Sequence, residues 1–377
     1  MSGGVDSSVA AALLQEQGFE VSGMFMKNWS PEDIQSLSDC PWEQDQADAA
    51  AVCEKLGIPF RSINFEKEYR ERVVNYFLEE YAAGRTPNPD VMCNKEIKFD
   101  AFLQAAQEMG AEYIATGHYA QISSDRGVFQ LLRGVDPKKD QSYFLWTLSS
   151  DQLSKALFPL GGMTKEQVRE LALKFDLPIA TKKDSQGICF IGHLDLKQFL
   201  LEHLTAKPGK AYLLPPYKEG VSFEERRRQG ALVGLHQGSM FYTIGERAGQ
   251  ILDNRLYHQI KGIRDVPSTY ILEKDFEENK LYVTDRRGDE HFYVTTIYLE
   301  GHSIMLSDMA ATTSSLKVQV RYQQKELAPI STITQEGELL KVTTSQPLWA
   351  VAPGQSLVFY QNERVAGGGI IHSLEHN

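Results

Sequence analysis

Short apolar runs alternate with segments of helical period over roughly the first 192 residues of the chain. Apolar residues spaced three and four apart predict helices, whereas short uninterrupted apolar runs predict buried strands. This order of elements is typical of an open parallel sheet covered by helices, so we expect a doubly wound α/β domain. The predicted helices span residues 7–17, 44–56, 67–83 and 95–109, and the predicted strands span residues 18–26, 58–65 and 113–116.

The pattern changes after residue 206, where Pro, Gly and Tyr become frequent and an arginine triplet, Arg226 to Arg228, appears. Beyond residue 279 the helical period fades, and alternating runs at 316–322 and 357–360 predict strands of an antiparallel β-barrel. We therefore expect three domains: a catalytic domain at 1–206, a small central domain at 207–278 and a C-terminal barrel at 279–377.

Length and composition agree with a multidomain globular protein. The 377 residues exceed what one hydrophobic core usually serves, and 42% hydrophobic with 24% charged residues is near the globular average. No apolar run approaches the eighteen residues of a membrane span, and the first residues resemble no secretory signal. These features argue against wholesale disorder and membrane insertion, and we expect a cytoplasmic protein.

Charge is unevenly distributed along the chain. The net charge of −11 argues against nucleic-acid binding over the whole surface. Residues 207–264, however, contain ten Lys and Arg against five Asp and Glu. We expect a polyanion to dock on this basic segment.

The residues Ser2-Gly3-Gly4-Val5-Asp6-Ser7 lie directly before a predicted helix. Glycines let backbone N–H groups approach a ligand closely, and a helix N-terminus favours an anion, so the segment suits a phosphate. A capped helix start without a ligand is the alternative. The segment lacks the Gly-Lys-Ser/Thr ending of a Walker A loop and the spacing of a dinucleotide fingerprint. It does resemble the S-G-G-x-D-S signature of the PP-loop ATP pyrophosphatases, which split ATP into AMP and pyrophosphate.

Four cysteines are too few for a disulfide scaffold in a chain of this length, and no C-x-x-C pair suggests structural zinc. Cys53 falls on the apolar face of a predicted helix, and we expect it and Cys40 to be buried small hydrophobes. Cys93 ends a turn-rich segment, residues 84–93, of the kind that often carries function. Cys189 lies in a second segment of small residues. Their neighbours favour a chemical role for both.

Motifs spread over the whole chain resemble the tRNA-specific 2-thiouridylases, and they occur in the order of that family. They are 84–90 (GRTPNPD), 93–95 (CNK) with 97–99 (IKF), 24–29 (MFMKNW), 115–119 (ATGHY), 139–144 (KDQSYF), 187–192 (GICFIG), 242–245 (YTIG) and 353–355 (PGQ). The family has a hydrophobic strand before its Ser-Gly-Gly loop, whereas this sequence begins inside that motif.

The resemblance implies an enzyme that replaces the C2 oxygen of the tRNA wobble uridine with sulfur. Cys189 would carry the sulfur as a persulfide, and Cys93 would be the nucleophile that resolves it. The implied ATP-binding residues are Met1, Ser2, Gly3, Gly4, Val5, Asp6, Ser7, Met26 and Gly117. The implied contacts of the target base are Asn88, Pro89 and Asp90, and those of the tRNA are His118, Lys139, Asp140, Gln141, Arg321, Tyr322 and Gln355.

The chemistry explains this set of residue types. The C2 oxygen of uridine is a poor leaving group, so ATP with Mg²⁺ would first adenylate it. Sulfur would then replace it, and attack of Cys93 on the persulfide would leave a Cys93–Cys189 disulfide. No resident metal site is expected. The implied partners are tRNAs of the lysine, glutamate and glutamine types, together with a sulfur-relay protein or a cysteine desulfurase.

Three other functions remain open at this stage. A PP-loop amidotransferase or synthetase needs an ammonia source, and nothing in the sequence resembles a glutaminase domain. A tRNA-lysidine synthetase shares ATP and tRNA but needs no paired cysteines. A non-catalytic RNA-binding protein on a truncated PP-loop domain would have no use for Asp6, Cys93 and Cys189.

Overall fold

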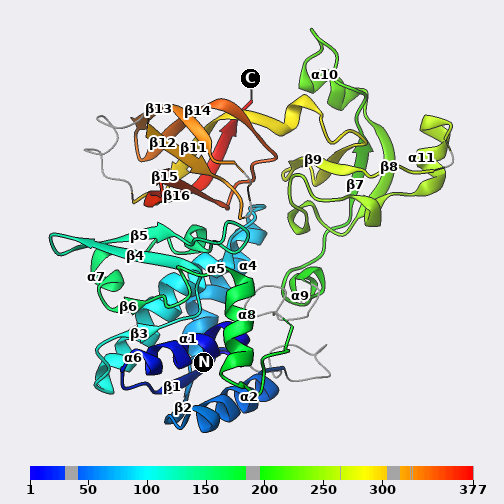
Figure 1. The fold of residues 1–377 in the computed structure, drawn as a ribbon. Helices are drawn as coiled ribbons and strands as arrows, with labels where there is room; N and C mark the ends of the chain where they lie inside the picture. Colours follow the sequence, from blue (N-terminus) through cyan, green and yellow to red (C-terminus); the bar gives the residue numbers. More distant parts are fainter. Residues whose placement is uncertain are drawn as a thin grey trace.

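The computed structural model describes residues 1–29, 41–183, 196–263, 265–303, 315–322, 324 and 326–376. Three regions follow one another along the chain (Figure 1): an α/β region at the N-terminus, a central region built on a small sheet, and a C-terminal barrel. This is the predicted architecture. None of the helices among these residues is long and apolar enough to cross a membrane.

The N-terminal region contains parallel strand pairs flanked by helices. β1 (Gly23–Lys27) pairs with β2 (Phe60–Asn64), and β3 (Ile114–Ala115) pairs with β6 (Ala156–Leu157), both in parallel. The predicted strands are therefore present but shorter. The surrounding helices include α1 (Val5–Glu16), α2 (Pro41–Leu56), α7 (Ser150–Leu153), α8 (Lys165–Lys174) and α9 (Leu196–His203).

Two of the predicted helices are interrupted by π-helical turns. The helix expected over 67–83 consists of α3 (Glu66–Tyr69), a π-helical turn (Arg70–Val74) and α4 (Asn75–Ala82). The helix expected to begin at Lys95 begins earlier, because Asn88 caps it and Pro89 occupies its first position. It comprises α5 (Pro89–Met92), a π-helical segment (Cys93–Ala101) and α6 (Phe102–Glu108).

The central region has a sheet with the strand order β8-β7-β10-β9. β10 pairs with β7 in parallel and with β9 in antiparallel orientation, so the central sheet extends beyond residue 278. The elements are β7 (Gly209–Leu213), α10 (Phe223–Arg228), β8 (Ala231–His236), α11 (Asn254–Lys261), β9 (Tyr270–Asp275) and β10 (Lys280–Thr284). Short 3₁₀ turns lie at Ser142–Phe144, Ser239–Phe241, Gly249–Ile251 and Glu290–Phe292.

The arginine triplet on α10 is only partly on the surface. Arg226 is 1% exposed and forms an ion pair of 2.6 Å with the equally buried Asp289. Arg227 contacts Glu224 and Asp275 within 3 Å. The prediction that this run contributes freely to a basic docking surface is therefore wrong for Arg226, because a buried carboxylate pairs with it inside the fold.

The C-terminal strands close into an antiparallel barrel. Its order is β11-β14-β13-β12-β15-β16, and β16 pairs back with β11. The strands are β11 (Tyr293–Glu300), β12 (Leu316–Gln319), β13 (Ala328–Glu336), β14 (Leu339–Trp349), β15 (Ser356–Gln361) and β16 (Arg364–Glu375). Buried apolar residues from these strands, such as Val318, Val342 and Phe359, form a core of their own.

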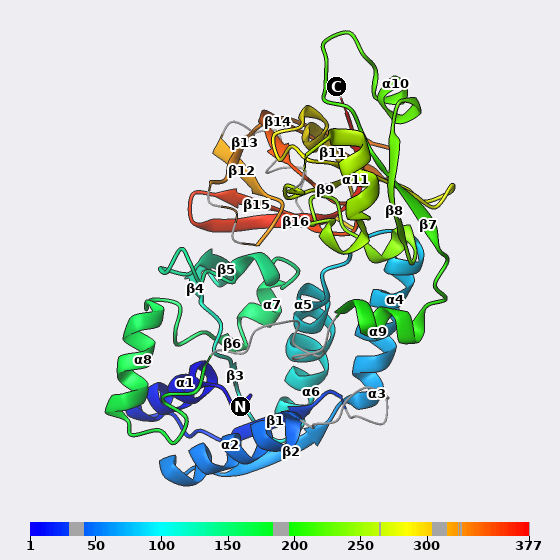
Figure 2. The same cartoon turned by 90° about the vertical axis from the view of Figure 1, so that its right-hand side faces the viewer.

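The barrel packs directly on the N-terminal region. The hairpin of β4 (Ala120–Asp125) and β5 (Val128–Arg133) lies beneath β16 in both views (Figures 1 and 2) and pairs with it at Leu132 and Arg364. Trp146 Nε1 also donates to Ser356 Oγ at 3.1 Å. These contacts fix the barrel against the segments that carry the predicted site residues.

Candidate active site

The loop from Ser2 to Ser7 forms a tight turn that leads into α1. The backbone N–H of Ser2 donates to Ser7 Oγ at 3.1 Å, and the two hydroxyl oxygens lie 3.0 Å apart. Gly3 has a φ of +70°, and a Cβ there would lie 2.3 Å from the carbonyl oxygen of Asp45. Glycine is therefore required at this position, and it lets the loop lie close to α2.

Two lysines reach this loop from distant parts of the sequence. Lys165, the first residue of α8, places its Nζ 2.7 Å from Asp6 Oδ1, which also accepts the Tyr119 hydroxyl at 2.9 Å. Lys182 Nζ donates to the Gly3 carbonyl at 3.0 Å and to Asp45 Oδ1 at 2.8 Å. Partial burial opposes the charge of Lys182, but its carboxylate partners raise its pKa above the ordinary value. The loop thus has two cationic side chains beside it.

Gly117 and His118 lie where the Ser2–Ser7 loop meets the rest of the domain. A Cβ on Gly117 would lie 2.7 Å from the backbone carbon of Asp6, so the two segments are in direct contact. His118 is buried, and its Nδ1 lies 2.7 Å from Thr116 Oγ1. Burial, together with the positive charge of Lys98, lowers the pKa of His118 well below its usual value. The imidazole is therefore neutral near pH 7.

Other predicted nucleotide contacts lie close by. The amine of Met1 donates to the Met24 carbonyl at 2.5 Å, and Met26 lies on the same strand, β1, packed partly into the core. Gly4 is the N-cap of α1 and Val5 is its first, buried residue. The predicted ATP-binding residues are thus grouped around the N-terminus of α1.

Cys93 is held inside the fold by the helix that Asn88 begins. Asn88 Oδ1 accepts the backbone N–H groups of Asp90 and Val91 at 3.2 and 3.3 Å, and Pro89 is buried in the first turn. The Cys93 side chain is 1% exposed. Burial raises the pKa of its thiol, while Lys98 acts in the opposite direction. The thiolate is therefore scarce in this conformation.

Lys98 lies on the same helical segment as Cys93 and also influences His118, which is next to Gly117. Its positive charge contributes to the pKa shifts of both Cys93 and His118, and Gly117, the neighbour of His118, touches the Ser2–Ser7 loop. The ring of Phe99, in the helical segment that begins at Cys93, lies 6.1 Å from that of His118. These contacts bring the Ser2–Ser7 loop and the Cys93 segment to a common region of the N-terminal domain.

The other cysteines divide into two cases. Cys53 is fully buried on α2 beside Ala49, as the helical spacing predicted. Cys40 and Cys189 lie outside the described residues.

Asp140 and Gln141 make their contacts within the protein. The Asp140 carboxylate accepts Arg133 Nε at 2.8 Å and the backbone N–H groups of Gly134 and Ser142 at 3.0 and 3.1 Å. Gln141 Oε1 accepts the Tyr119 N–H at 3.0 Å. Lys139, in the same turn, is partly exposed. Gln141 thus braces the segment that holds Tyr119, and Asp140 braces the end of β5 and the turn after it.

The predicted tRNA contacts of the barrel also lie against other regions of the protein. Arg321 Nη2 donates to the Ile244 carbonyl at 3.1 Å and to that of Ala350, and the rings of Tyr322 and Phe144 are 4.5 Å apart. Gln355 Nε2 donates to the carbonyl of Thr86 at 2.8 Å and to that of Pro87 at 3.1 Å. Its amide therefore contacts the segment that precedes Asn88.

Known protein families match most of the chain. Family models match residues 1–193 (tRNA methyl transferase HUP domain), 197–285 (tRNA methyl transferase PRC-barrel domain) and 294–371 (Aminomethyltransferase beta-barrel domain). A protein of Listeria monocytogenes named tRNA-specific 2-thiouridylase MnmA is 44% identical over 384 residues, covering 100% of this chain and 94% of the relative.

The chain belongs to the tRNA-specific 2-thiouridylase family. A relative of the same name from Alkaliphilus oremlandii is 45% identical and covers 99% of this chain and 96% of its own length. Another from Lactococcus lactis is 44% identical with 98% and 93% coverage. The resemblance found in the motifs is thereby confirmed over the full length.

For this member of the 2-thiouridylase family, the structure adds residues that the sequence did not point to. Lys165 and Lys182 are 159 and 179 residues from their partners in the loop, and Tyr119 is 113 residues from Asp6. Thr164 and Gln167 form a capping box that marks the start of α8, but no local signal shows what Lys165 contacts. Only the tertiary fold reveals these neighbours.

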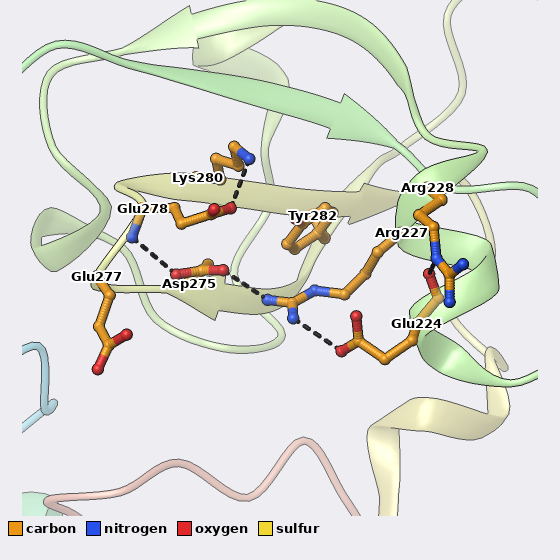
Figure 3. A pocket seen from close by; sticks show the side chains of 8 residues that line it. All are labelled: Glu224, Arg227, Arg228, Asp275, Glu277, Glu278, Lys280 and Tyr282. Carbon is orange, nitrogen blue, oxygen red and sulfur yellow. Dashed lines mark hydrogen bonds and ion pairs between the residues drawn. The ribbon is translucent and has the colours of Figure 1, made fainter.

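A pocket of about 430 Å³ on the central region lies elsewhere in this thiouridylase (Figure 3). Its charged side chains pair among themselves: Arg227 with Glu224 and Asp275, and Lys280 with Glu278. It lies beside α10, which is at the opposite end of the molecule from the N-terminus in Figures 1 and 2. This pocket is therefore not part of the candidate site. Its lining consists of Glu224, Arg227, Arg228, Asp275, Glu277, Glu278, Lys280 and Tyr282.

Proposed function

We propose that this protein replaces the C2 oxygen of the wobble uridine of tRNA with sulfur and cleaves ATP to AMP and pyrophosphate. The observation that carries the proposal is the grouping of the Ser2–Ser7 loop, with Lys165 and Lys182 beside it, in one region with the Cys93 segment, through the contacts of Gly117 with the loop and of Phe99 with His118. Membership of the 2-thiouridylase family supports the same reaction.

The loop suits the phosphates of ATP. Backbone N–H groups at the start of α1 favour an anion. Lys165 and Lys182, which pair with Asp6, Asp45 and Asp48 in this structure, would turn toward the phosphates and supply the positive charge that a Walker A lysine provides in other ATP-binding loops. Asp6 would help to hold Mg²⁺, which typically takes one or two carboxylates together with substrate phosphates. Among the described residues no cluster of three or more His, Cys, Asp or Glu forms a dedicated metal site. When bound, Mg²⁺ neutralises phosphate charge.

The first half of the proposed reaction activates the uridine. Its C2 oxygen attacks the α-phosphate of ATP, pyrophosphate leaves, and the oxygen becomes part of a good leaving group. Asn88, Pro89 and Asp90 would meet the target base, since they begin the helix that carries Cys93. Neutral His118 beside Lys98 would border the reacting groups without adding another positive charge.

The second half transfers sulfur. Cys93 as thiolate attacks the inner sulfur of a Cys189 persulfide, which forms a Cys93–Cys189 disulfide and releases the outer sulfur as hydrosulfide. The hydrosulfide adds to C2, and AMP departs. An external thiol reductant then reopens the disulfide. A sulfur-relay protein or a cysteine desulfurase would load the persulfide.

We also propose that tRNA docks across the central and barrel regions, with the body of residues 1–206 performing the chemistry. Lys139, Arg321 and Tyr322 are partly exposed and remain proposed contacts. The substrates would be tRNAs of the lysine, glutamate and glutamine types.

The test combines purified protein, ATP, Mg²⁺, unmodified tRNA, a thiol reductant and a cysteine desulfurase with cysteine as the persulfide source, followed by phosphate analysis and mass analysis of the nucleosides. We expect tRNA-dependent AMP and pyrophosphate together with 2-thiouridine. ADP and orthophosphate would exclude the pyrophosphatase assignment. A methylated nucleoside formed without ATP cleavage would instead favour the methyl transfer that the names of the matching domain families describe.

A further inference from the structure

The segment Gly84 to Pro87, which precedes the Cys93 helix, accepts hydrogen bonds from side chains of the central region and of the barrel. From the central sheet, Lys274 Nζ donates to the Gly84 carbonyl at 2.8 Å and to the Tyr242 carbonyl at 2.7 Å. From the barrel, Gln355 Nε2 donates to the carbonyls of Thr86 and Pro87 at 2.8 and 3.1 Å. Three carbonyls of one loop are thus satisfied by two side chains from different regions.

Close packing accompanies these hydrogen bonds. The Thr86 N–H donates to the Pro353 carbonyl at 2.8 Å, and the hydroxyls of Thr86 and Thr243 lie 3.1 Å apart. Gly354 has a φ of +91°, and a Cβ there would lie 2.8 Å from the backbone of Thr86. The loop therefore has little space in which to shift while both regions are docked.

Any shift of this loop is passed on to Cys93. Asn88 follows Pro87 directly and caps α5, and the helical backbone continues from α5 through Cys93. Val91, on the same turn, packs with Val358 and Tyr360 of the barrel. Because a helix is stiff over such short lengths, a displacement at residues 84–87 moves the thiol as well.

We propose that Lys274 and Gln355 are positioning residues that place Cys93 for sulfur transfer. Each acts through the Gly84–Pro87 loop, and Gln355 acts in this way instead of as a contact of the tRNA. The proposal rests on the proposed function in assigning Cys93 as the resolving nucleophile. A buried carbonyl without a hydrogen-bond donor destabilises the docked conformation of its loop. Removal of either donor should therefore loosen the Gly84–Pro87 loop locally.

The experiment compares Gln355→Leu with Gln361→Leu, and Lys274→Met with Lys280→Met. Gln361 lies on the same barrel but contacts Ser315, and Lys280 lies on the same sheet but pairs with Glu278. Three quantities are measured on the full-length protein: the Kd for tRNA, the single-turnover rate of thiolation, and the rate of Cys93 alkylation by iodoacetamide, read from the Cys93 peptide.

Both test variants should bind tRNA with unchanged affinity, lose about tenfold or more in thiolation rate, and alkylate at Cys93 about tenfold faster, because a misplaced nucleophile reacts poorly and a loosened loop opens more often. The control variants should match the unsubstituted protein. A weaker tRNA complex with unchanged Cys93 alkylation would overturn the proposal and make Gln355 a tRNA contact. Unchanged behaviour in all three assays would also overturn it.

Two further measures keep the result decisive. Gln355→Glu preserves side-chain size but turns an acceptor toward the two carbonyls, so it replaces Gln355→Leu if that variant fails to fold. The alkylation assay needs no turnover. If the unsubstituted protein does not thiolate tRNA but the test variants alkylate faster at Cys93, the positioning role is supported and the proposed function is excluded. If the test variants thiolate tRNA at the normal rate, the proposed function is supported and the positioning role is excluded.

Discussion

Cys93 illustrates how burial shapes reactivity at the scale of one residue. Its side chain is almost fully enclosed, and desolvation raises the pKa of the thiol against the opposing influence of Lys98. Since the thiolate is the nucleophile, the raised pKa and the burial of Cys93 lower its reactivity in this conformation. Docking of tRNA is the event in the proposed reaction that would change these surroundings, so burial would protect the thiol between turnovers.

Substitution of the cysteines separates their roles. Cys93→Ser should still accept a persulfide on Cys189 but lose 2-thiouridine formation, because a hydroxyl cannot attack the persulfide. Cys189→Ser should lose both steps, and Cys53→Ser, the buried control on α2, should retain both. The assay is labelled-sulfur loading followed by nucleoside analysis. Wild-type thiolation by Cys93→Ser would exclude a resolving role.

At the scale of elements, the proposed nucleotide site depends on backbone contact between segments. The N-terminus of α1 meets the turn after β3 at Gly117, where no side chain fits between them. Lysines from α8 and from the segment after it complete the site. The loop therefore depends on the packing of several elements and not on its own sequence alone.

Gly117→Ala tests this contact. The added methyl would lie within 3 Å of the Asp6 and Ser7 backbone and displace the loop, so ATP affinity should fall by about tenfold or more while tRNA affinity is retained. Gly162→Ala is the matched control, since a Cβ there meets open space. Equilibrium binding of ATP and of tRNA measures the two effects. Equal ATP affinity in both variants would contradict the tight contact.

At the scale of the whole molecule, buried charges join the three regions. The Arg226–Asp289 pair holds α10 to the segment between the central sheet and the barrel, and Arg226 also donates to the Pro215 carbonyl. Lys274 joins the central sheet to the Gly84 loop. Such groups contribute to stability only while their partners stay in place.

Arg226→Ala should destabilise the protein by about 3–5 kcal/mol, because it leaves the buried Asp289 carboxylate without its cation. Arg228→Ala, on the same helix but not buried, should change stability by less than about 0.5 kcal/mol. Denaturant unfolding followed through the central region gives both values. Equal midpoints for the two variants would show that the buried pair does not stabilise the fold.

Lys274 predicts a pH dependence of stability. Burial lowers its pKa to about 8 from an ordinary value of 10.5, so between these values the folded protein binds fewer protons than the unfolded chain. The contribution of Lys274 to stability is therefore fully present above pH 10.5 and is lost as the pH falls toward 8. The free energy of unfolding should be measured from pH 7.5 to 10.5. With increasing pH it should rise less, or fall more steeply, in Lys274→Met than in the unsubstituted protein. Parallel pH curves would contradict the lowered pKa.

Local sequence patterns predicted much of the fold and the family of this protein. Apolar periodicity identified the parallel α/β region and the barrel strands, and it placed Cys53 on the buried face of α2, because short-range spacing decides which face of an element is apolar. The motif residues identified the family. Asn88 and Pro89 also carried a helix-start signal, although the helix was expected only from Lys95.

Tertiary structure decided what local patterns do not encode. The π-helical turns at Arg70–Val74 and Cys93–Ala101 shift the helical period within helices that the apolar spacing predicted to be regular. A run of arginines predicts an exposed face, but Arg226 is buried in the fold, where it pairs with the Asp289 carboxylate 63 residues away. Lys165, Lys182 and Lys274 gain their roles from partners more than thirty residues distant, and Gln355 from carbonyls 268 and 269 residues away. Spacing along a chain fixes neighbours within an element, whereas the fold alone brings such distant groups within hydrogen-bonding distance.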